Sequence, residues 1–263
     1  MNARNWSLSS RLAVAALLAI FVMCSILAPP GGLTALPLGA PFERPSLAHL
    51  LGTDDLGRDG LAALAQGGRT SLQVASIATL LALALGTFVG LCAGLGPRWL
   101  DETLMRITDV VASLLTLLIA ILVAALFGGS LIGLALVLGL TRWPVIARIV
   151  RVESMSLRER EFVRAAIALG GTPSRVAMRH VLPQLLPTML SASGIVFGGA
   201  ILAEAALAFV GLGDPALTSW GQLIAAGFTF VDRAWWSWAF PSAAIIIASG
   251  LVALAADITD ATP

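Results

Sequence analysis

Apolar residues in this chain gather into long runs, and short polar segments separate the runs. The clearest run, 74–95, holds 22 residues without a charged side chain, enough for one helix to cross a hydrocarbon core of about 30 Å. Inside lipid, only helices or closed barrels satisfy their own backbone hydrogen bonds, and the sequence lacks a barrel pattern. The pattern therefore predicts an all-α polytopic membrane protein with six transmembrane helices, at 12–28, 74–95, 107–127, 131–150, 185–212 and 240–256.

We expect a single transmembrane domain over 1–263, with its core spans within 72–256. The first apolar run, 12–28, follows a short basic start, so a cleaved signal peptide is the alternative interpretation. The run is longer than the apolar part of most signal peptides, and no A-x-A cleavage site precedes Pro29-Pro30. We therefore favour a retained N-terminal span.

Arginine is distributed unevenly between the two sides that six spans would define. Twelve of the sixteen arginines fall on the side that holds both termini and the segment between the fourth and fifth spans. Since positive residues favour the cytoplasm, we expect both termini and the loop 151–183 to be cytoplasmic. The polar loops 29–70 and 213–239 are then expected on the periplasmic side, while 96–106 forms a tight cytoplasmic turn.

The segment 142–183 is the one long charge-dense stretch of the chain, with eight arginines. Residues 157–169 predict an amphipathic helix, and Gly170-Gly171 is expected to end it. A second short helix, capped by Thr172 or Ser174, is expected to close at Leu182-Pro183. Two short helices around a glycine break, between two membrane spans, indicate a docking surface for a partner.

The composition excludes several classes of function. The chain is 58% hydrophobic and 12% charged, against about 25% charged in ordinary globular proteins. Its net charge of +1 gives no basic field for binding nucleic acid. Cys24 and Cys92 both lie in apolar runs and are expected to be small buried side chains. With only His49 and His180 besides, we expect no metal site and no cofactor in this chain.

Lysine is absent from the sequence, and all sixteen cationic side chains are arginine. A phosphate-binding loop of the GxxxxGK[ST] type needs its lysine to reach the nucleotide phosphates. The chain therefore cannot be an ATPase of that kind, and any ATP and Mg²⁺ must bind to another subunit. No Ser/His/Asp or Cys/His group and no paired carboxylates appear at usable spacing, so we expect no catalysis by this chain.

Residues 164–183, RAAIALGGTPSRVAMRHVLP, resemble the EAA loop of binding-protein-dependent ABC importer permeases. The matching positions are Ala165, Ala166, Gly170 and Leu182-Pro183. Arg164 stands where that family has glutamate, which removes the basis for any salt bridge assigned to the glutamate. The resemblance implies that this loop forms the coupling helices that dock on a separate ATPase subunit.

Further segments are similar to the C-type permeases of dipeptide, oligopeptide and nickel importers. They span nearly the whole chain in order: 49–59, 67–75, 156–166, 202–213, 219–221 and 256–263. Two departures are a shorter loop after Gly213, and Ser113-Leu114-Leu115 in place of a common Phe-Pro.

The resemblance implies a bacterial inner-membrane complex. This chain would pair with a homologous second permease as a heterodimer, with two ATP-binding subunits inside and a solute-binding protein outside. Di- or oligopeptides are the expected cargo, with nickel or a metal chelate as the alternative. The ATPase-coupling residues would be Phe162, Arg164, Ala165, Ala166, Leu169, Gly170, Gly171 and Pro183.

Other candidate residues have two interpretations each. Glu204, deep in an apolar run, should face the bundle interior or a watery path, or else hydrogen-bond a neighbouring helix. Asp109 is the second intramembrane polar candidate, expected to pair with Arg106 or Arg142.

The external loops supply the candidates for contact with the binding protein. These are Asp54, Asp55, Arg58, Asp59 and Trp220. The alternative for the charged set is a loop held by its own ion pairs with glycine turns at Gly52 and Gly57. The alternative for the tryptophans is an aromatic belt at the membrane interface.

Two classes of protein compete with an importer subunit. A stand-alone secondary transporter or channel would work without ATP and purify as a single species. A membrane-embedded enzyme would need a reactive constellation that the sequence lacks.

Overall fold

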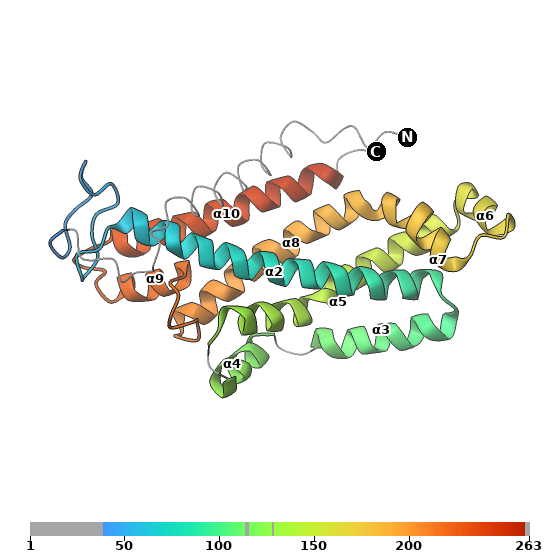
Figure 1. Ribbon diagram of the computed structural model, residues 1–263, viewed down its shortest axis with the longest axis horizontal. Coiled ribbons are helices and arrows are strands. Elements are labelled where there is room, and N and C mark those ends of the chain that lie inside the picture. Colours follow the sequence, from blue (N-terminus) through green and yellow to red (C-terminus); the bar gives the residue numbers. More distant parts are fainter. Residues whose placement is uncertain (1–38, 114–115, 128, 261–263) are drawn as a thin grey trace.

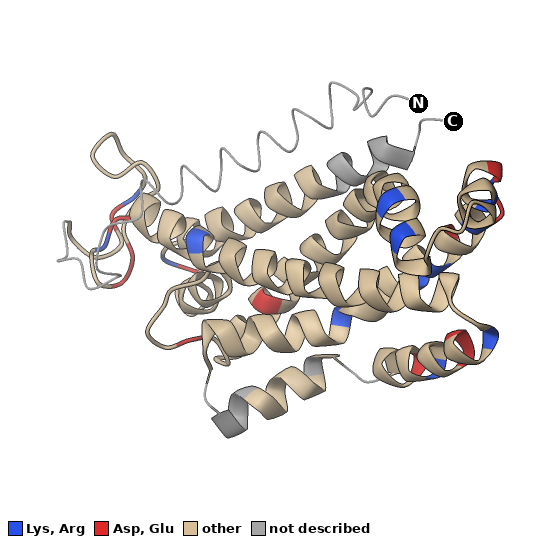
Figure 2. Ribbon diagram, turned by 45° about the vertical axis from the view of Figure 1, so that its right-hand side comes forward, with Lys and Arg blue, Asp and Glu red and all other residues tan. Residues whose placement is uncertain are grey.

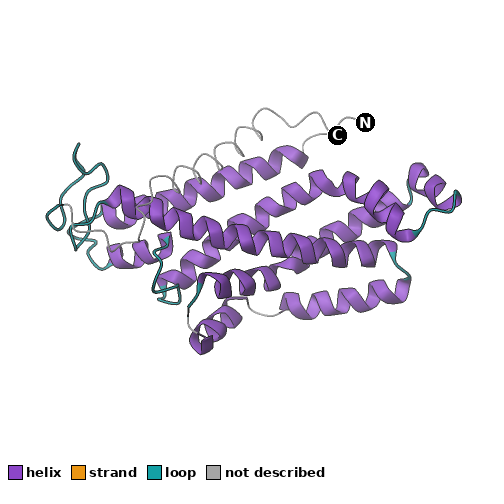
Figure 3. Ribbon diagram, in the orientation of Figure 1, coloured by secondary structure: helices purple, strands orange, loops and turns teal. Residues whose placement is uncertain are grey.

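The computed structural model describes residues 39–113, 116–127 and 129–260, which form an elongated bundle of helices (Figure 1). These residues contain helices and loops but no strand (Figure 3). Three helices among them are long and apolar enough to cross a membrane, Gly60–Leu95, Leu131–Arg158 and Pro173–Phe209. A shorter apolar helix covers Trp236–Val252. The expected helical membrane protein is therefore found, and the predicted span 12–28 lies outside the described residues.

Helices α2 (Gly60–Leu95) and α5 (Leu131–Arg158) pack along one another at the centre of the bundle. The face of α2 that meets α5 carries small residues, among them Ala78, Ala82, Gly86, Gly90 and Gly94. A side chain added at Gly90 would lie 2.7 Å from both the carbonyl oxygen of Ala147 and the Cβ of Val150. Small residues let helix backbones approach closely, which drives helix association inside lipid.

The remaining helices surround this pair (Figure 1). Helix α8 (Leu182–Phe209) packs on both α2 and α5, and α10 (Trp236–Asp260) packs on α8. The short helix α9 (Trp220–Phe228) fills the corner between α8 and α10. Helices α3 (Arg98–Ser113) and α4 (Thr116–Phe127) lie on the outer side of α5.

The two ends of the bundle carry different segments. The loop 39–59 and α9 lie at one end, while α6 (Glu161–Ala168) and α7 (Pro173–Val176) lie at the other (Figure 1). Charged residues gather mainly towards these ends, and the middle of the bundle is largely uncharged (Figure 2). Residues 39–59 and α9, which belong to the two loops predicted on the periplasmic side, lie at the same end of the bundle, opposite α6 and α7. The number of six spans and the cytoplasmic termini remain predictions.

Several predicted helix boundaries were wrong because local capping extends the helices. Helix α2 begins at Gly60 and not near residue 74, since the carboxylate of Asp59 accepts a hydrogen bond from the Ala62 amide at 3.0 Å and caps it. The glycines at 67–68 remain helical, and Gly67 lies directly against Trp220 of α9. The predicted turn 96–106 is short, because α3 already begins at Arg98.

The expected single span at 107–127 falls on the end of α3 and on α4, and residues 114–115 between them lie outside the described residues. Helix α3 starts early because Asp101 stands in its first turn, where a negative charge is favourable. An ion pair of 2.8 Å between Arg98 and Glu102, one turn apart, supports the same turn.

The predicted helix 157–169 was also wrong. Helix α5 continues past Pro144 to Arg158, the chain turns at Glu159-Arg160, and α6 starts at Glu161. The second predicted short helix does not close at Leu182-Pro183. It runs from α7 through a π-helical turn, η2 (Ala177–Val181), directly into α8, with Pro183 in the first turn of α8.

The predicted loop 213–239 is partly helical. Helix α9 starts with a capping box, in which Ser219 accepts from the Gln222 amide and the Gln222 side chain accepts from the Ser219 amide at 3.0 Å. Helix α10 begins at Trp236, and the predicted span 240–256 lies within it. The span predicted at 185–212 ends with α8 at Phe209.

We predict that Gly90→Ala lowers the midpoint of thermal unfolding of the detergent-solubilised protein. The added methyl group would force α2 and α5 apart, and overpacking of this kind costs about 1–3 kcal/mol. Gly250→Ala is the matched control, because nothing lies within 4 Å of the Cβ position there. It should leave the midpoint unchanged or raise it. Equal midpoints for the two variants would contradict close α2–α5 packing at Gly90.

Candidate functional site

Helix α6 projects from one end of the bundle as a short separate element (Figure 1). Glu161 occupies its first turn, where a carboxylate offsets the helix dipole. At its end, the amide of Gly170 donates to the carbonyl of Ile167 at 2.9 Å, and that of Gly171 to Ala166 at 3.0 Å. This is a Schellman motif, and Gly170 has the positive φ of 82° that the motif requires. The glycine break therefore acts as a helix stop, as its sequence predicted.

One side of α6 is anchored in the bundle. Val163 is fully buried and belongs to the same apolar cluster as Leu157, Val176 and Val181. Ala166, one turn further along, packs partly against this cluster. Val163 was not among the predicted coupling residues, because 157–169 was predicted to form one helix. The signal for it was the pair Val163 and Ala166, which share a face at helical spacing.

The other side of α6 is exposed and apolar. Phe162 is 44% exposed and Leu169 is 90% exposed, and Ala165 is exposed between them. Three of the four predicted apolar docking residues therefore protrude together, while Ala166 turns inward. Arg164 is exposed beside them. We call the surface of Phe162, Arg164, Ala165, Leu169 and Gly170 the α6 surface.

Gly171 and Pro183 do not join the α6 surface. An added Cβ at Gly171 would lie 2.7 Å from the carbonyl oxygen of Ala166, so this glycine serves the helix stop. Pro183 stands in α8, beyond α7 and η2, where its missing N–H falls next to the π-helical turn.

Ion pairs fix α3 to α5 near the same end. The guanidinium of Arg151 donates to both carboxylate oxygens of Asp101, with its Nη2 at 2.6 Å. This contact holds the pKa of Asp101 below its usual value. The stabilisation from the pair is therefore present above the unfolded pKa of that carboxyl and is lost as pH falls through the lower folded pKa.

Asp109 pairs with Arg148 at 2.8 Å, so the expected pairing with Arg106 or Arg142 was wrong. Both side chains are more than half exposed, and Asp109 is not a buried polar group. The packing of α3 on α5 brings Asp109 beside Arg148, whereas Arg142 reaches the Gly199 carbonyl of α8.

Glu204 is the buried carboxylate of the described residues, with 2% of the residue exposed. The hydroxyl of Ser71, on α2, donates to it at 2.8 Å. The same hydroxyl accepts the backbone amide of Trp220 at 3.2 Å, at the start of α9. Through Ser71, Glu204 connects α8 to α2 and α9. This arrangement agrees with the second interpretation of Glu204, a residue that hydrogen-bonds a neighbouring helix.

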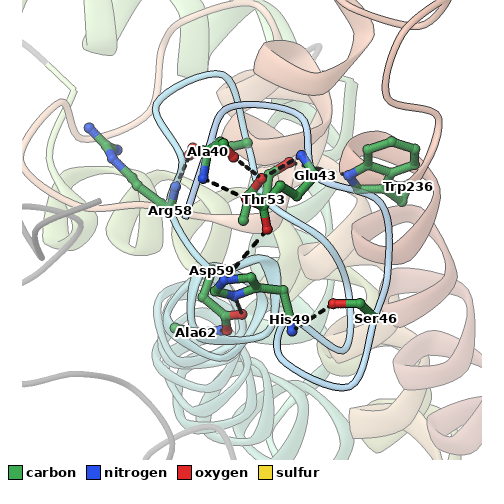
Figure 4. A network of polar contacts seen from close by, with 10 residues as sticks. Ala40, Glu43, Ser46, His49, Thr53, Arg58, Asp59, Ala62 and Trp236 are labelled. Atoms are coloured by element: carbon green, nitrogen blue, oxygen red, sulfur yellow. Dashed lines mark hydrogen bonds and ion pairs between the residues drawn. The ribbon is translucent and has the colours of Figure 1, made fainter. Parts of the chain in front are cut away.

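The loop 39–59 forms its own polar network (Figure 4). His49 Nδ1 lies 3.0 Å from the carboxylate of Asp59, which also caps α2. The carboxylate of Asp54 accepts hydrogen bonds from the backbone amides of Leu56 at 2.9 Å and Arg58 at 2.8 Å. Gly52 and Gly57 both have a positive φ of 74°. Asp54 and Asp59 therefore hold the loop together, whereas Asp55 is exposed and Arg58 half-buried.

Trp220, expected to face a binding protein, is instead buried, with 1% exposed. Its indole Nε1 donates to the carbonyl of Leu64 at 2.9 Å, and its ring packs where Gly67 leaves room. Trp236 is also buried and donates to the carbonyl of Thr53 at 3.2 Å (Figure 4). Of the clustered tryptophans, Trp235 is the exposed one, at 56%. These contacts lock the loop 39–59 and α9 onto the ends of α2 and α10.

The described residues hold no group of three or more His, Cys, Asp or Glu side chains arranged to bind a metal ion. Cys92 is a free, half-buried thiol, and Cys24 lies outside the described residues.

Comparison with known proteins identifies similar permeases. The family described as binding-protein-dependent transport system inner membrane component matches residues 84–261. A dipeptide transport system permease protein of Alkalihalophilus pseudofirmus is 36% identical over 244 residues, covering 90% of this chain and 80% of that protein. A putative peptide permease protein of Brucella suis is 35% identical over 214 residues, covering 80% and 71%.

Solved structures give the same fold. An inward-facing conformation of the MetNI methionine ABC transporter matches with a TM-score of 0.62. The match covers 76% of this chain and 97% of that chain at 18% identity, so it shows the fold alone.

We predict that Glu204→Ala destabilises the protein by about 1–3 kcal/mol, because it leaves the buried hydroxyl of Ser71 without its acceptor. Glu204→Gln keeps a carbonyl acceptor of nearly the same shape and should retain most of the stability that Glu204→Ala loses. Thermal unfolding in detergent measures both. Equal destabilisation by the two variants would show that the hydrogen bonds to Glu204 do not hold α8 to α2 and α9.

Proposed function

The chain belongs to the family of binding-protein-dependent transport system inner membrane components, and from this premise we propose that it is a permease subunit of an ATP-driven importer of di- and oligopeptides. The observation that carries the proposal is the α6 surface. An exposed apolar patch with a short helix and an ordered glycine stop is unusual on the water-facing end of a membrane bundle, and it fits a groove on a partner.

The α6 surface is connected to the membrane helices on both sides. Helix α5 leads into it, and α7 leads from it through η2 into α8. Val163 anchors it against Leu157 of α5 and Val181 of η2. Movement of a docked ATPase subunit would therefore shift α5 and α8 together as a rigid unit. This is a two-state element whose balance nucleotide binding on the partner can change.

The arrangement of the ends supports the remaining assignments. With the α6 surface in the cytoplasm, the loop 39–59 and α9 face the outside, where a solute-binding protein would dock near the exposed Asp55 and the half-buried Arg58. Two ATP-binding subunits would bind ATP and Mg²⁺, and a homologous second permease would complete the path in the bacterial inner membrane.

The cargo assignment rests on the similar relatives, whose names specify dipeptides and peptides. Those names favour peptide over nickel or a metal chelate, the alternative that the sequence resemblance raised.

We predict that Gly170→Val reduces peptide uptake in cells by about 5- to 30-fold while the protein still reaches the membrane. Valine in a left-handed conformation costs roughly 1–2 kcal/mol. This cost lowers the population of molecules with the native end of α6 by the same factor. Gly170→Asn is the matched variant, because asparagine tolerates this conformation and nothing lies within 4 Å of the Cβ position. It should retain most uptake. Full uptake with Gly170→Val would refute the coupling role of the α6 surface.

A further inference from the structure

Arg142 is a charged side chain in the middle of a membrane-spanning helix. It lies eleven residues after Leu131, where α5 begins, and sixteen residues before Arg158, where α5 ends. Its distance along the helix axis is therefore about 16 Å from the first end and about 24 Å from the second. An arginine at this depth is unfavourable against lipid and should face the bundle interior, a watery cavity or a partner.

The described residues leave most of the hydrogen-bonding capacity of Arg142 unused. Its Nη2 donates to the backbone carbonyl of Gly199, on α8, at 3.3 Å. A guanidinium has five N–H donors, and no further acceptor for them is found among the described residues. The other two arginines of this stretch of α5 differ, because Arg148 and Arg151 each pair with a carboxylate of α3. No carboxylate of the described residues lies within ion-pair distance of Arg142.

Helix α8 presents bare backbone at this position. An added side chain at Gly199 would collide with the guanidinium of Arg142. At the preceding Gly198, an added Cβ would meet only the Cβ of Ser249, at 3.9 Å. The two glycines thus leave room for Arg142 to reach α8, and Arg142 itself is only half-buried. A small anionic group could approach the guanidinium from its exposed side.

We propose that Arg142 binds the carboxylate of the transported peptide within the membrane. This inference rests on the proposed function, which supplies a cargo with a free C-terminal carboxylate. A guanidinium binds a carboxylate through two parallel hydrogen bonds, and this pairing is among the strongest that proteins make. The same positive charge repels a bare divalent cation, so Arg142 favours peptide over free Ni²⁺.

The test compares one dipeptide with its C-terminal amide, in proteoliposomes that hold the complete transporter and its binding protein. Uptake of each is measured for the wild type and for Arg142→Gln. The same binding protein serves the wild type and the variant. Its own preference for acid or amide therefore cancels when the acid-to-amide uptake ratio of the variant is divided by that of the wild type. We expect the ratio to fall about 10- to 100-fold in Arg142→Gln, the effect of losing a hydrogen-bonded ion pair. Arg142→Lys keeps the charge and should lie between the two.

Arg148→Gln is the matched control, since it makes the same change on the same helix at a side chain paired with Asp109. It should leave the acid-to-amide ratio at the wild-type value. An unchanged ratio in Arg142→Gln, with peptide uptake intact, would overturn the inference and leave the proposed function standing. Dissociation of the Arg142→Gln complex on size-exclusion chromatography would also overturn it, because Arg142 would then bind the second permease. A wild-type transporter that carries no peptide would overturn the proposed function itself.

Discussion

The close packing of α2 against α5 is the constraint on which the rest of the structure depends. Between lipid-embedded helices the hydrophobic effect gives little attraction, so contact must come from backbones that approach closely. Gly86, Gly90 and Gly94 provide this on α2, since a side chain at any of them would run into α5. On α5, Gly139 allows the same close approach, because a Cβ added there would lie 2.9 Å from the carbonyl oxygen of Ala78 on α2.

This packed pair gives the protein a rigid axis with a different surface at each end. Asp59 caps α2 and belongs to the polar network of the loop 39–59, so that loop is fixed to one end of the axis. At the other end α5 leads into α6, and Val163 holds α6 against the bundle. Arg142 lies between them on α5 and touches α8. A push on the α6 surface would therefore reach the membrane interior along α5, through the short turn at Glu159-Arg160.

The fold class and the approximate positions of the apolar helices could be predicted from sequence, because uninterrupted apolar runs leave the backbone no alternative to helix in lipid. The boundaries could not. Residues 60–70 were assigned to the polar loop 29–70, yet they form the start of α2, where Trp220 packs onto Gly67. Pro183 suggested a helix end, yet the π-helical turn before it lets α8 continue. In each case a tertiary contact or a local shift in hydrogen bonding outweighed the local preference.

In the candidate site, too, features set by local sequence could be predicted, and features set by tertiary contacts could not. Gly170 as a helix stop and the exposure of Phe162 and Leu169 followed from local pattern and spacing. The burial of Trp220, the anchoring by Val163 and the pairing of Asp109 with Arg148 depend on segments far apart in the chain. Periodicity along one helix holds no information on which neighbour a side chain will meet.

The central claim is that the α6 surface binds the ATP-hydrolysing subunit. Incorporation of a photo-crosslinking amino acid at Ala165 tests it directly. The reference is the same substitution at the exposed Leu47, in the loop 39–59 that lies at the opposite end of the bundle. Irradiation of membranes that hold the complete transporter should link position 165 to a nucleotide-binding subunit, and position 47 should give no such product. A crosslink to that subunit from position 47 but not from position 165 would contradict the account.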